Sequence, residues 1–136
     1  MIIKRKYTVL LLIFLSLFFH FRLFSQSKSG EEIPTECEAM RALLDNSLIR
    51  ISQNEDASLI FIFRLGKSEK SRKVISRRME TIKNFFKFRI PAFNRFVLAE
   101  GERTAGLGKL EIYIDGKLTY ELFAKKNADL GDDCLE

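Results

Sequence analysis

The sequence predicts an α+β fold in which two helices pack on one mixed β-sheet. Three features support this prediction. A helical apolar periodicity begins near residue 36, a second helical stretch lies between two apolar segments, and two alternating segments flank Asp115-Gly116. A helix between two strands favours a parallel βαβ unit, and an Asp-Gly pair between alternating segments is typical of a two-residue hairpin. We therefore expect a βαβ core followed by a C-terminal β-hairpin.

The first expected helix begins near residue 36. Thr35-Glu36-Cys37-Glu38 has the S/T-x-x-E pattern of a capping box. Four apolar residues then recur at intervals of four, four and three positions, which is helical spacing: Met40, Leu44, Leu48 and Ile51. Residues 58–65, SLIFIFRL, are apolar on both alternating faces, which favours a central strand that ends at Gly66.

The second expected helix covers residues 69–88 and ends before Pro91, because the residue before a proline avoids the helical region. Residues 95–100, RFVLAE, are expected to form the second strand. A loop at 101–108 then leads to the hairpin strands 109–114 and 117–123, whose apolar and polar residues alternate.

Residues 1–25 have the order of a secretory signal peptide. A basic start precedes a continuous apolar run at 7–19, and polar residues then lead to Ser25, after which we expect cleavage. The run is shorter than the roughly 20 residues that span a bilayer, and a retained N-terminal membrane anchor is the alternative. We therefore expect an exported, periplasmic or extracellular protein that touches a membrane only through an uncleaved signal. The polar residues 26–35 are expected to be a flexible lead-in.

Export changes the charge and the available chemistry. Residues 1–25 hold four of the 23 basic residues and the single histidine, His20, which leaves 19 basic against 18 acidic residues. We expect no nucleic-acid partner for a near-neutral exported chain, and no metal, cofactor or imidazole-based catalysis without histidine. Residues 67–95 nevertheless carry ten basic and two acidic side chains. This basic centre is expected either to attract an anionic polymer or to be a solvated helix face that is neutralised internally.

The two cysteines, Cys37 and Cys134, both follow the expected signal peptide. An even cysteine count in an exported chain predicts a disulfide, and two cysteines allow one intramolecular pairing. The predicted domain therefore covers residues 36–124, and an irregular tail at 125–136 is tied back to the first helix.

Two adjacent arginines in the second helix, Arg77 and Arg78, are expected to have different surroundings. At 100° per residue Arg78 falls inside the apolar stripe that faces the sheet, near Ser71, whereas Arg77 faces solvent. A charge in an apolar stripe needs a partner, because burying it alone costs several kcal/mol. Four further polar residues end the two parallel strands, where ligands of α/β units bind: Arg64, Glu100, Glu102 and Arg103. Arg78 is therefore expected either to form an internal ion pair with Glu100 or Glu102 or to clamp a ligand carboxylate.

Four stretches, SLIFIFRLG, VISRRMETI, FVLAEGER and GKLEIYI, resemble the OmpA-like peptidoglycan-associating domain over roughly residues 37–123. The resemblance implies that Arg78 corresponds to the arginine that holds the carboxylate of a peptidoglycan stem peptide. Ser71 stands where that family usually has asparagine. The family's first strand ends in G-H-T-D, and its aspartate grips the amino group of the ligand, but here Phe63-Arg64-Leu65-Gly66 occupies that place. The family helix between the second and third strands is reduced to the loop GERTAGLG.

Together these features predict an exported, non-catalytic binding or structural module of the cell envelope with an OmpA-like fold that lacks the ligand aspartate. The expected partners are peptidoglycan, another anionic envelope polymer or an envelope protein. One alternative is a peptidoglycan-binding domain that uses Arg78, and another is a small secreted hydrolase that uses Glu100 and Glu102 as its carboxylates. The candidate ligand-binding residues are Arg78, Arg64, Ser71, Glu100, Glu102 and Arg103.

Overall fold

The computed structural model describes residues 32–131, which contain two helices and four strands. The predicted signal peptide at 1–25 and the predicted disulfide partner Cys134 lie outside the described residues. Along the chain the elements are α2 (Cys37–Ser52), β1 (Leu59–Arg64), α3 (Arg72–Arg89), β2 (Phe96–Glu100), β3 (Gly108–Ile114) and β4 (Lys117–Ala124).

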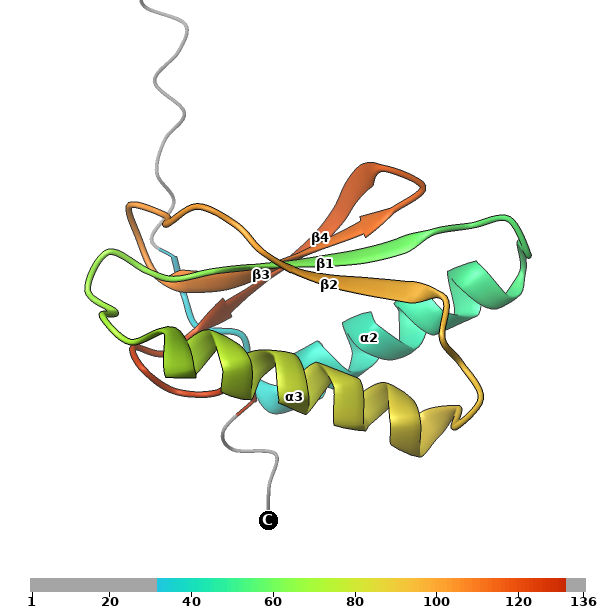
Figure 1. The fold of residues 1–136 in the computed structure, drawn as a ribbon, viewed down its shortest axis with the longest axis horizontal. Helices are drawn as coiled ribbons and strands as arrows, with labels where there is room; N and C mark the ends of the chain where they lie inside the picture. Colours follow the sequence, from blue (N-terminus) through green and yellow to red (C-terminus); the bar gives the residue numbers. More distant parts are fainter. Residues whose placement is uncertain (1–31, 132–136) are drawn as a thin grey trace, which may run out of the picture. The chain divides into compact units, whose positions relative to one another are not determined.

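The four strands form one mixed sheet in the order β2-β1-β3-β4. β1 pairs with β2 in parallel, and α3 connects the two, whereas β1 pairs with β3 and β3 pairs with β4 in antiparallel orientation. Both helices cover the same face of the sheet (Figure 1). The predicted α+β class, the parallel pairing across a helix and the C-terminal hairpin are confirmed.

The turn between β3 and β4 has the backbone that the Asp-Gly pair predicts. Asp115 and Gly116 both have positive φ angles, of 52° and 73°. A two-residue turn of this kind has the twist that two antiparallel strands need. Asp115 also accepts a hydrogen bond through Oδ1 from the backbone N–H of Ser58, which ties the turn to the start of β1.

The capping box predicted at the start of the first helix is wrong. The N-cap residue of α2 is Glu36, and its side chain makes no capping hydrogen bond. Thr35 instead pairs with the last strand, because its N–H donates to the carbonyl of Phe123 (2.8 Å) and its Oγ1 accepts from the N–H of Phe123 (2.9 Å). This part of the predicted lead-in is therefore hydrogen-bonded to β4. Thr35 therefore bonds to a strand residue 88 positions away instead of capping the helix.

The second helix begins three residues later than predicted. Ser71 is its N-cap, with Oγ accepting from the N–H of Lys73, and the helix runs to Arg89. Residues 66–70 form a tight turn in which the N–H of Glu69 donates to the carbonyl of Gly66 (3.1 Å). Glu69 was expected to open the helix, but it lies in this turn instead, and its side chain is free to fold back toward the domain interior.

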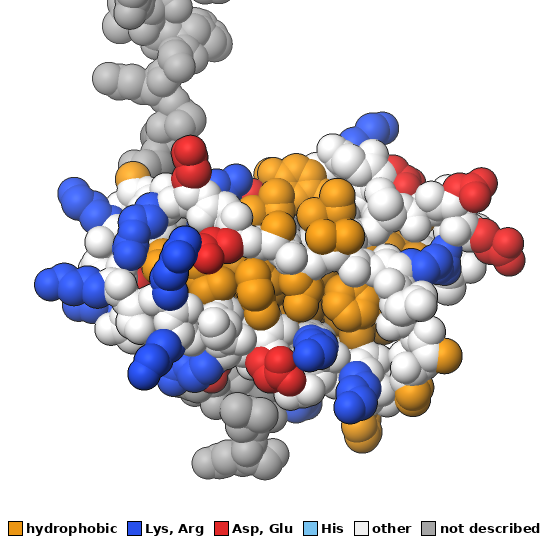
Figure 2. Space-filling model, viewed as in Figure 1, with side chains coloured by type: hydrophobic (Ala, Val, Ile, Leu, Met, Phe, Trp, Pro, Cys, Tyr) orange, Lys and Arg blue, Asp and Glu red, His pale blue; other side chains and the backbone are white. Residues whose placement is uncertain are grey.

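Charged side chains are unevenly spread over the surface. Figure 2 shows basic side chains gathered at the end of the domain where the β1–α3 loop and the start of α3 lie. The opposite end, near the α2–β1 turn, shows acidic side chains. Of the basic residues at 67–95, some therefore gather at the start of α3, and others, such as Lys87 and Arg89, lie in its last turn.

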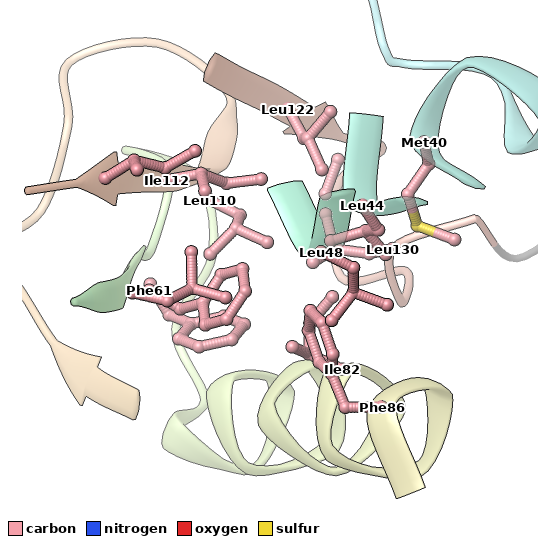
Figure 3. Packing of buried hydrophobic residues seen from close by; sticks show 14 of the residues in the cluster. Met40, Leu44, Leu48, Phe61, Ile82, Phe86, Leu110, Ile112, Leu122 and Leu130 are labelled. Carbon is pink, nitrogen blue, oxygen red and sulfur yellow. The ribbon is translucent and has the colours of Figure 1, made fainter. Parts of the chain in front are cut away.

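The hydrophobic core lies between the helices and one face of the sheet (Figure 3). Phe61 and Phe63 of β1 are fully buried beneath α3, and the ring centroids of Phe61 and Phe86 are 5.3 Å apart. The opposite face is not covered by either helix. There Ile60 and Ile62 are half-buried, and Val97 and Leu118 are exposed. Within residues 32–131, neither helix has the length and apolarity required to cross a bilayer.

Candidate functional site

Arg78 is buried in an ion pair with Glu69, at the end of the domain where the predicted site residues gather. Its Nη1 lies 3.0 Å from Glu69 Oε2 and its Nη2 lies 2.5 Å from Glu69 Oε1, which is a bidentate geometry. Each side chain is 1 % exposed. The prediction that Arg78 lies on the buried face of the helix is confirmed.

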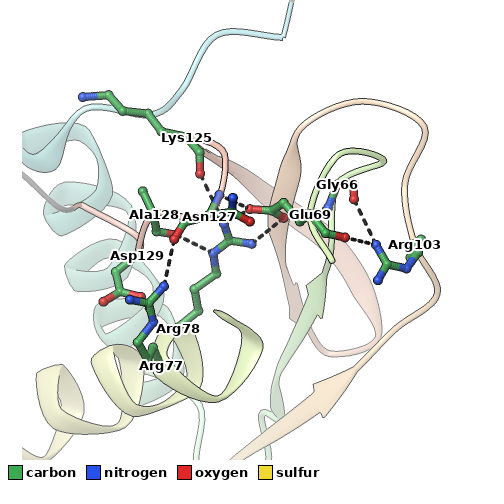
Figure 4. A network of polar contacts seen from close by, with 9 residues as sticks. All are labelled: Gly66, Glu69, Arg77, Arg78, Arg103, Lys125, Asn127, Ala128 and Asp129. Atoms are coloured by element: carbon green, nitrogen blue, oxygen red, sulfur yellow. Dashed lines mark hydrogen bonds and ion pairs between the residues drawn. The ribbon is translucent and has the colours of Figure 1, made fainter. Parts of the chain in front are cut away.

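The buried pair ties three separate segments together (Figure 4). The Glu69 carboxylate accepts from the N–H of Gly66 (2.7 Å) and from the N–H of Asn127 (2.8 Å). Arg78 Nε donates to the carbonyl of Ala128 (2.9 Å), and Nη2 also donates to the carbonyl of Lys125 (3.3 Å). All three guanidinium nitrogens therefore have acceptors from the protein itself. The pair holds the β1–α3 turn and the segment after β4 against α3.

Two glycines, Gly66 and Gly108, allow close packing around the buried pair. A Cβ atom at Gly108, the first residue of β3, would overlap Glu69 Oε2 and would lie 2.5 Å from Arg78 Nη1. A Cβ atom at Gly66 would lie 2.6 Å from the backbone nitrogen of Gly108. Gly108 is thus explained by close approach to the ion pair, and Gly66 by close approach to the backbone at the start of β3.

The two predicted partners of Arg78, Glu100 and Glu102, are wrong. Glu100 ends β2 and lies 3.3 Å from Nε of Arg72, in an ion pair whose side chains are 38 % and 83 % exposed. Glu102 is exposed in the following loop, where its carbonyl accepts from Arg64 Nη1 (3.2 Å). Glu69 is nearer because the turn after Gly66 folds its side chain toward the first turns of α3.

The other predicted site residues also have partners within the domain. Arg64 Nε lies 2.9 Å from Glu111 Oε1 on the uncovered face of the sheet. Arg103 Nη1 donates to the carbonyls of Gly66 (3.3 Å) and Glu69. Ser71 is the N-cap of α3. The structure thus brings Arg78, Arg103 and Ser71 together around the β1–α3 turn. Arg64 belongs to a different group of charges on the uncovered face.

The uncovered face carries a second polar network around Glu111. The Glu111 carboxylate is 7 % exposed and lies between Arg64 and Lys109, whose Nζ is 3.0 Å away. Burial alone would raise the pKa of Glu111, but hydrogen bonding and charge from Lys109 and Arg64 outweigh it and lower the pKa. Burial alone would lower the pKa of Lys109, but hydrogen bonding and charge from Glu121 and Glu111 outweigh it and raise the pKa. Both groups therefore stay ionised at neutral pH.

Stability is expected to fall in acid because two buried carboxylates must be protonated. For Glu69, burial raises the pKa, but hydrogen bonds from Arg78, Gly66 and Asn127 outweigh it, so that the folded-state pKa lies below 4.5. A lowered folded-state pKa stabilises the protein above the unfolded-state value, and this stabilisation is lost as the pH falls through the folded-state value. We expect a level urea midpoint between pH 7 and about pH 5 and a fall below about pH 4.5.

Glu69→Gln and Glu111→Gln should each lower the urea midpoint at pH 7 and flatten this acid limb. Glu55→Gln, which changes an exposed carboxylate, is the control. An acid limb of unchanged steepness in both variants would contradict the assignment of the pH dependence to these two groups.

A basic hollow lies beside the buried pair, at the start of α3. It has a volume of about 550 Å³ and is lined by Lys70, Ser71, Lys73, Arg77 and Lys126, among others. All the charged side chains that line it within residues 32–131 are cations. Arg77 reaches an acidic partner just outside, because its Nε lies 3.5 Å from Asp129 Oδ1. The charge count predicts a basic centre at residues 67–95 that attracts an anionic polymer or is a solvated helix face, but it does not single out Lys70 or Lys73, and Lys126 lies outside that range.

No family model, curated protein or solved structure matched this chain. Within residues 32–131 there is also no group of three or more histidine, cysteine or acidic side chains placed to hold a metal ion.

Proposed function

We propose that this protein is an exported, non-catalytic binding module of the cell envelope that contacts an anionic polymer through the basic hollow at the start of α3. The observation that carries the proposal is the set of four cations around one hollow, Lys70, Lys73, Arg77 and Lys126. Export rests on the order of charged and apolar residues at 1–25. The α+β fold with a parallel βαβ core is compatible with an OmpA-like domain, which we propose as the fold family.

The geometry of Arg78 argues against a ligand clamp at that residue. Its guanidinium is 1 % exposed, and its bidentate position is filled by the Glu69 carboxylate. A stem-peptide carboxylate would have to displace Glu69 and leave that carboxylate buried without a partner, which costs several kcal/mol. The basic hollow needs no such displacement, because its cations are exposed. We therefore favour surface recognition of an anionic polymer over a peptidoglycan clamp at Arg78.

The arrangement of Glu100 and Glu102 supports a non-catalytic role. Glycoside hydrolysis needs two carboxylates that flank a bound sugar, one of which has a raised pKa. Glu100 instead pairs with Arg72 on the surface, and Glu102 is exposed. Neither residue lines the basic hollow.

The predicted disulfide is part of this proposal. Cys37 is not a free cysteine, and Cys134 is the chain's one other cysteine. We propose that the two form a bond that ties the tail to the start of α2, as is common in small exported domains.

Charge reversal in the basic hollow is expected to abolish polyanion binding. Lys70, Lys73 and Lys126 are exposed, so the triple change to glutamate should leave the fold intact while it removes three cations from one site. We expect wild-type protein to bind long-chain polyphosphate and purified cell wall, and the triple variant to bind at least ten times more weakly, as measured by co-sedimentation at low salt.

The matched control reverses three cations elsewhere on the surface. Lys83→Glu, Lys87→Glu and Lys117→Glu change the net charge by the same amount at exposed positions outside the hollow. We expect this control to lose a few-fold in affinity through the general field, and no more. Equal losses in the two triple variants would show that net charge alone attracts the polymer and would overturn the assignment to the hollow.

A further inference from the structure

The hydrogen-bond donors that remain open in the basic hollow decide which anionic group it binds. Four cations line it: Lys70, Lys73, Arg77 and Lys126. Within residues 32–131 the lysines that form ion pairs are Lys83 and Lys109, neither of which lines the hollow. The ammonium groups of the three lysines in the hollow are therefore open to a ligand.

The guanidinium of Arg77, in contrast, is already used within the domain. Its Nη2 donates to the carbonyl of Asn127 (2.8 Å), and its Nε lies 3.5 Å from Asp129 Oδ1 (Figure 4). The guanidinium fork of an arginine binds a planar carboxylate through two parallel hydrogen bonds. This fork is partly occupied at Arg77, and Glu69 fills it at Arg78. Bidentate capture of a ligand carboxylate by either arginine is therefore disfavoured.

The open lysines reach the hollow from two separate segments of the chain. Lys70 and Lys73 flank Ser71, the N-cap of α3. Lys126 lies after β4, in a turn whose closing hydrogen bond runs between residues 128 and 125 (3.1 Å). An anion in the hollow can therefore contact ammonium groups of two different segments at once.

The buried ion pair fixes the residues on either side of Lys126. The N–H of Asn127 donates to the Glu69 carboxylate (2.8 Å). Arg78 Nη2 donates to the carbonyl of Lys125 (3.3 Å). A site whose parts are already fixed loses less conformational entropy when a ligand binds. The hollow is therefore preorganised, and its lysines differ in this respect from independent surface charges.

A phosphate group matches this arrangement better than a carboxylate does. A terminal phosphate has three acceptor oxygens that point in different directions and nearly two negative charges, whereas a carboxylate has two oxygens in one plane. Lysine ammonium groups act as compact point charges, so they favour the anion with the higher charge and the wider spread of acceptors. Among residues 32–131 no acidic side chain lines the hollow, and Ser68 and Ser71 add hydroxyl groups to its wall.

We propose that the basic hollow recognises the phosphate groups of its polymer, with Lys70 and Lys73 on one side of the phosphate and Lys126 on the other. This inference rests on the proposed function, because it names the chemistry of the polymer that the hollow binds. It makes a phosphate-bearing polymer the preferred ligand over a polymer of carboxylates.

The test compares polyphosphate with poly-L-glutamate of equal charge number, at neutral pH and matched ionic strength. Dissociation constants of the exported protein are measured by fluorescence anisotropy of the labelled polymers. We expect the wild type to bind polyphosphate several-fold more tightly than polyglutamate. Lys126→Gln should remove most of this preference, because the phosphate loses its contact with one of the two segments. Lys117→Gln, the same change at an exposed lysine outside the hollow, should keep the preference.

The outcomes that would overturn this inference differ from those that would overturn the proposed function. Equal affinities for the two polymers, both lowered by the triple lysine change, would refute the phosphate preference but leave polymer binding at the hollow intact. A preference that persists unchanged in Lys126→Gln would show that it arises elsewhere on the surface. Binding of neither polymer would refute the proposed function and this inference with it.

Vesicles of phosphatidylglycerol present phosphate on a membrane surface and serve as a third ligand. We expect the protein to bind them more weakly, per accessible phosphate, than it binds polyphosphate. Tighter binding to the vesicles, lost in Lys126→Gln, would place a lipid headgroup in the hollow and overturn a polymer as the source of the phosphate.

Discussion

Arg78→Ala is expected to destabilise the protein by about 3–5 kcal/mol, because it leaves the Glu69 carboxylate buried without its charged partner. The variant also removes the donors to the carbonyls of Ala128 and Lys125, so the segment after β4 loses its contact with α3. The midpoint of urea denaturation at pH 7 is the measurement. A loss of this size is a large share of the total stability of a domain of this length.

The neighbouring residue supplies the matched control. Arg77 makes an ion pair with Asp129 and donates to the carbonyl of Asn127, but its side chain is 55 % exposed. Exposed pairs of this kind contribute about 0–1 kcal/mol, so Arg77→Ala should change the urea midpoint little. Equal effects of the two alanine variants would contradict a special role for the buried pair.

A double variant separates the pair from its surroundings. If Glu69 and Arg78 act mainly on each other, Glu69→Ala combined with Arg78→Ala should cost clearly less than the sum of the two single changes. Additive losses would instead show that the backbone contacts of each side chain, to Gly66 and Asn127 or to Ala128, carry the stability.

Loss of the proposed Cys37–Cys134 bond is expected to cost about 4–5 kcal/mol, because the bond closes a loop of nearly a hundred residues and restricts the unfolded chain. Cys134→Ser should therefore lower the urea midpoint about as much as reduction lowers that of the wild type. Reduction should not lower the midpoint of the variant further.

Thiol counting checks the premise of this prediction. Alkylation of exported protein under non-reducing, denaturing conditions should label neither cysteine, and both should be labelled after reduction. Two reactive thiols in the untreated protein would refute the bond.

The fold could be predicted from the sequence where local patterns and tertiary packing agree. The residues of β1 are apolar on both faces, and the structure places this strand between two neighbours in the sheet. Asp115-Gly116 predicted the hairpin because a two-residue turn with positive φ angles suits this pair. The capping box failed because Thr35 gains two hydrogen bonds with Phe123, a contact that sequence spacing does not reveal.

The candidate site could be predicted only in part. Helical periodicity placed Arg78 on the buried face, since the angle between residues of a helix is fixed. Its partner was missed because Glu69 was assigned to the helix itself, whereas Glu100 and Glu102 were chosen by their position at a strand end. A glutamate three residues after a strand-ending glycine, in a turn that precedes a capping serine, was the available indication. The hollow needs Lys126 beside Lys70 and Lys73, and no local pattern brings these residues together.

The most direct test of recognition through the basic hollow is the salt dependence of retention on purified cell wall. Salt screens the attraction between exposed cations and an anionic polymer. Wild-type retention should therefore fall steeply between about 0.05 and 0.5 M NaCl, the range in which the Debye length shrinks below 10 Å. The Lys70→Glu, Lys73→Glu, Lys126→Glu variant should show little retention at any salt concentration. Arg78→Ala, assayed below its melting temperature, should keep salt-sensitive retention, weaker than that of the wild type because the segment that carries Lys126 loses its contact with α3. The contrary result is retention that persists at about 0.5 M NaCl, is lost in Arg78→Ala and is kept in the lysine variant. This result would contradict recognition through the basic hollow and would identify Arg78 as the ligand clamp.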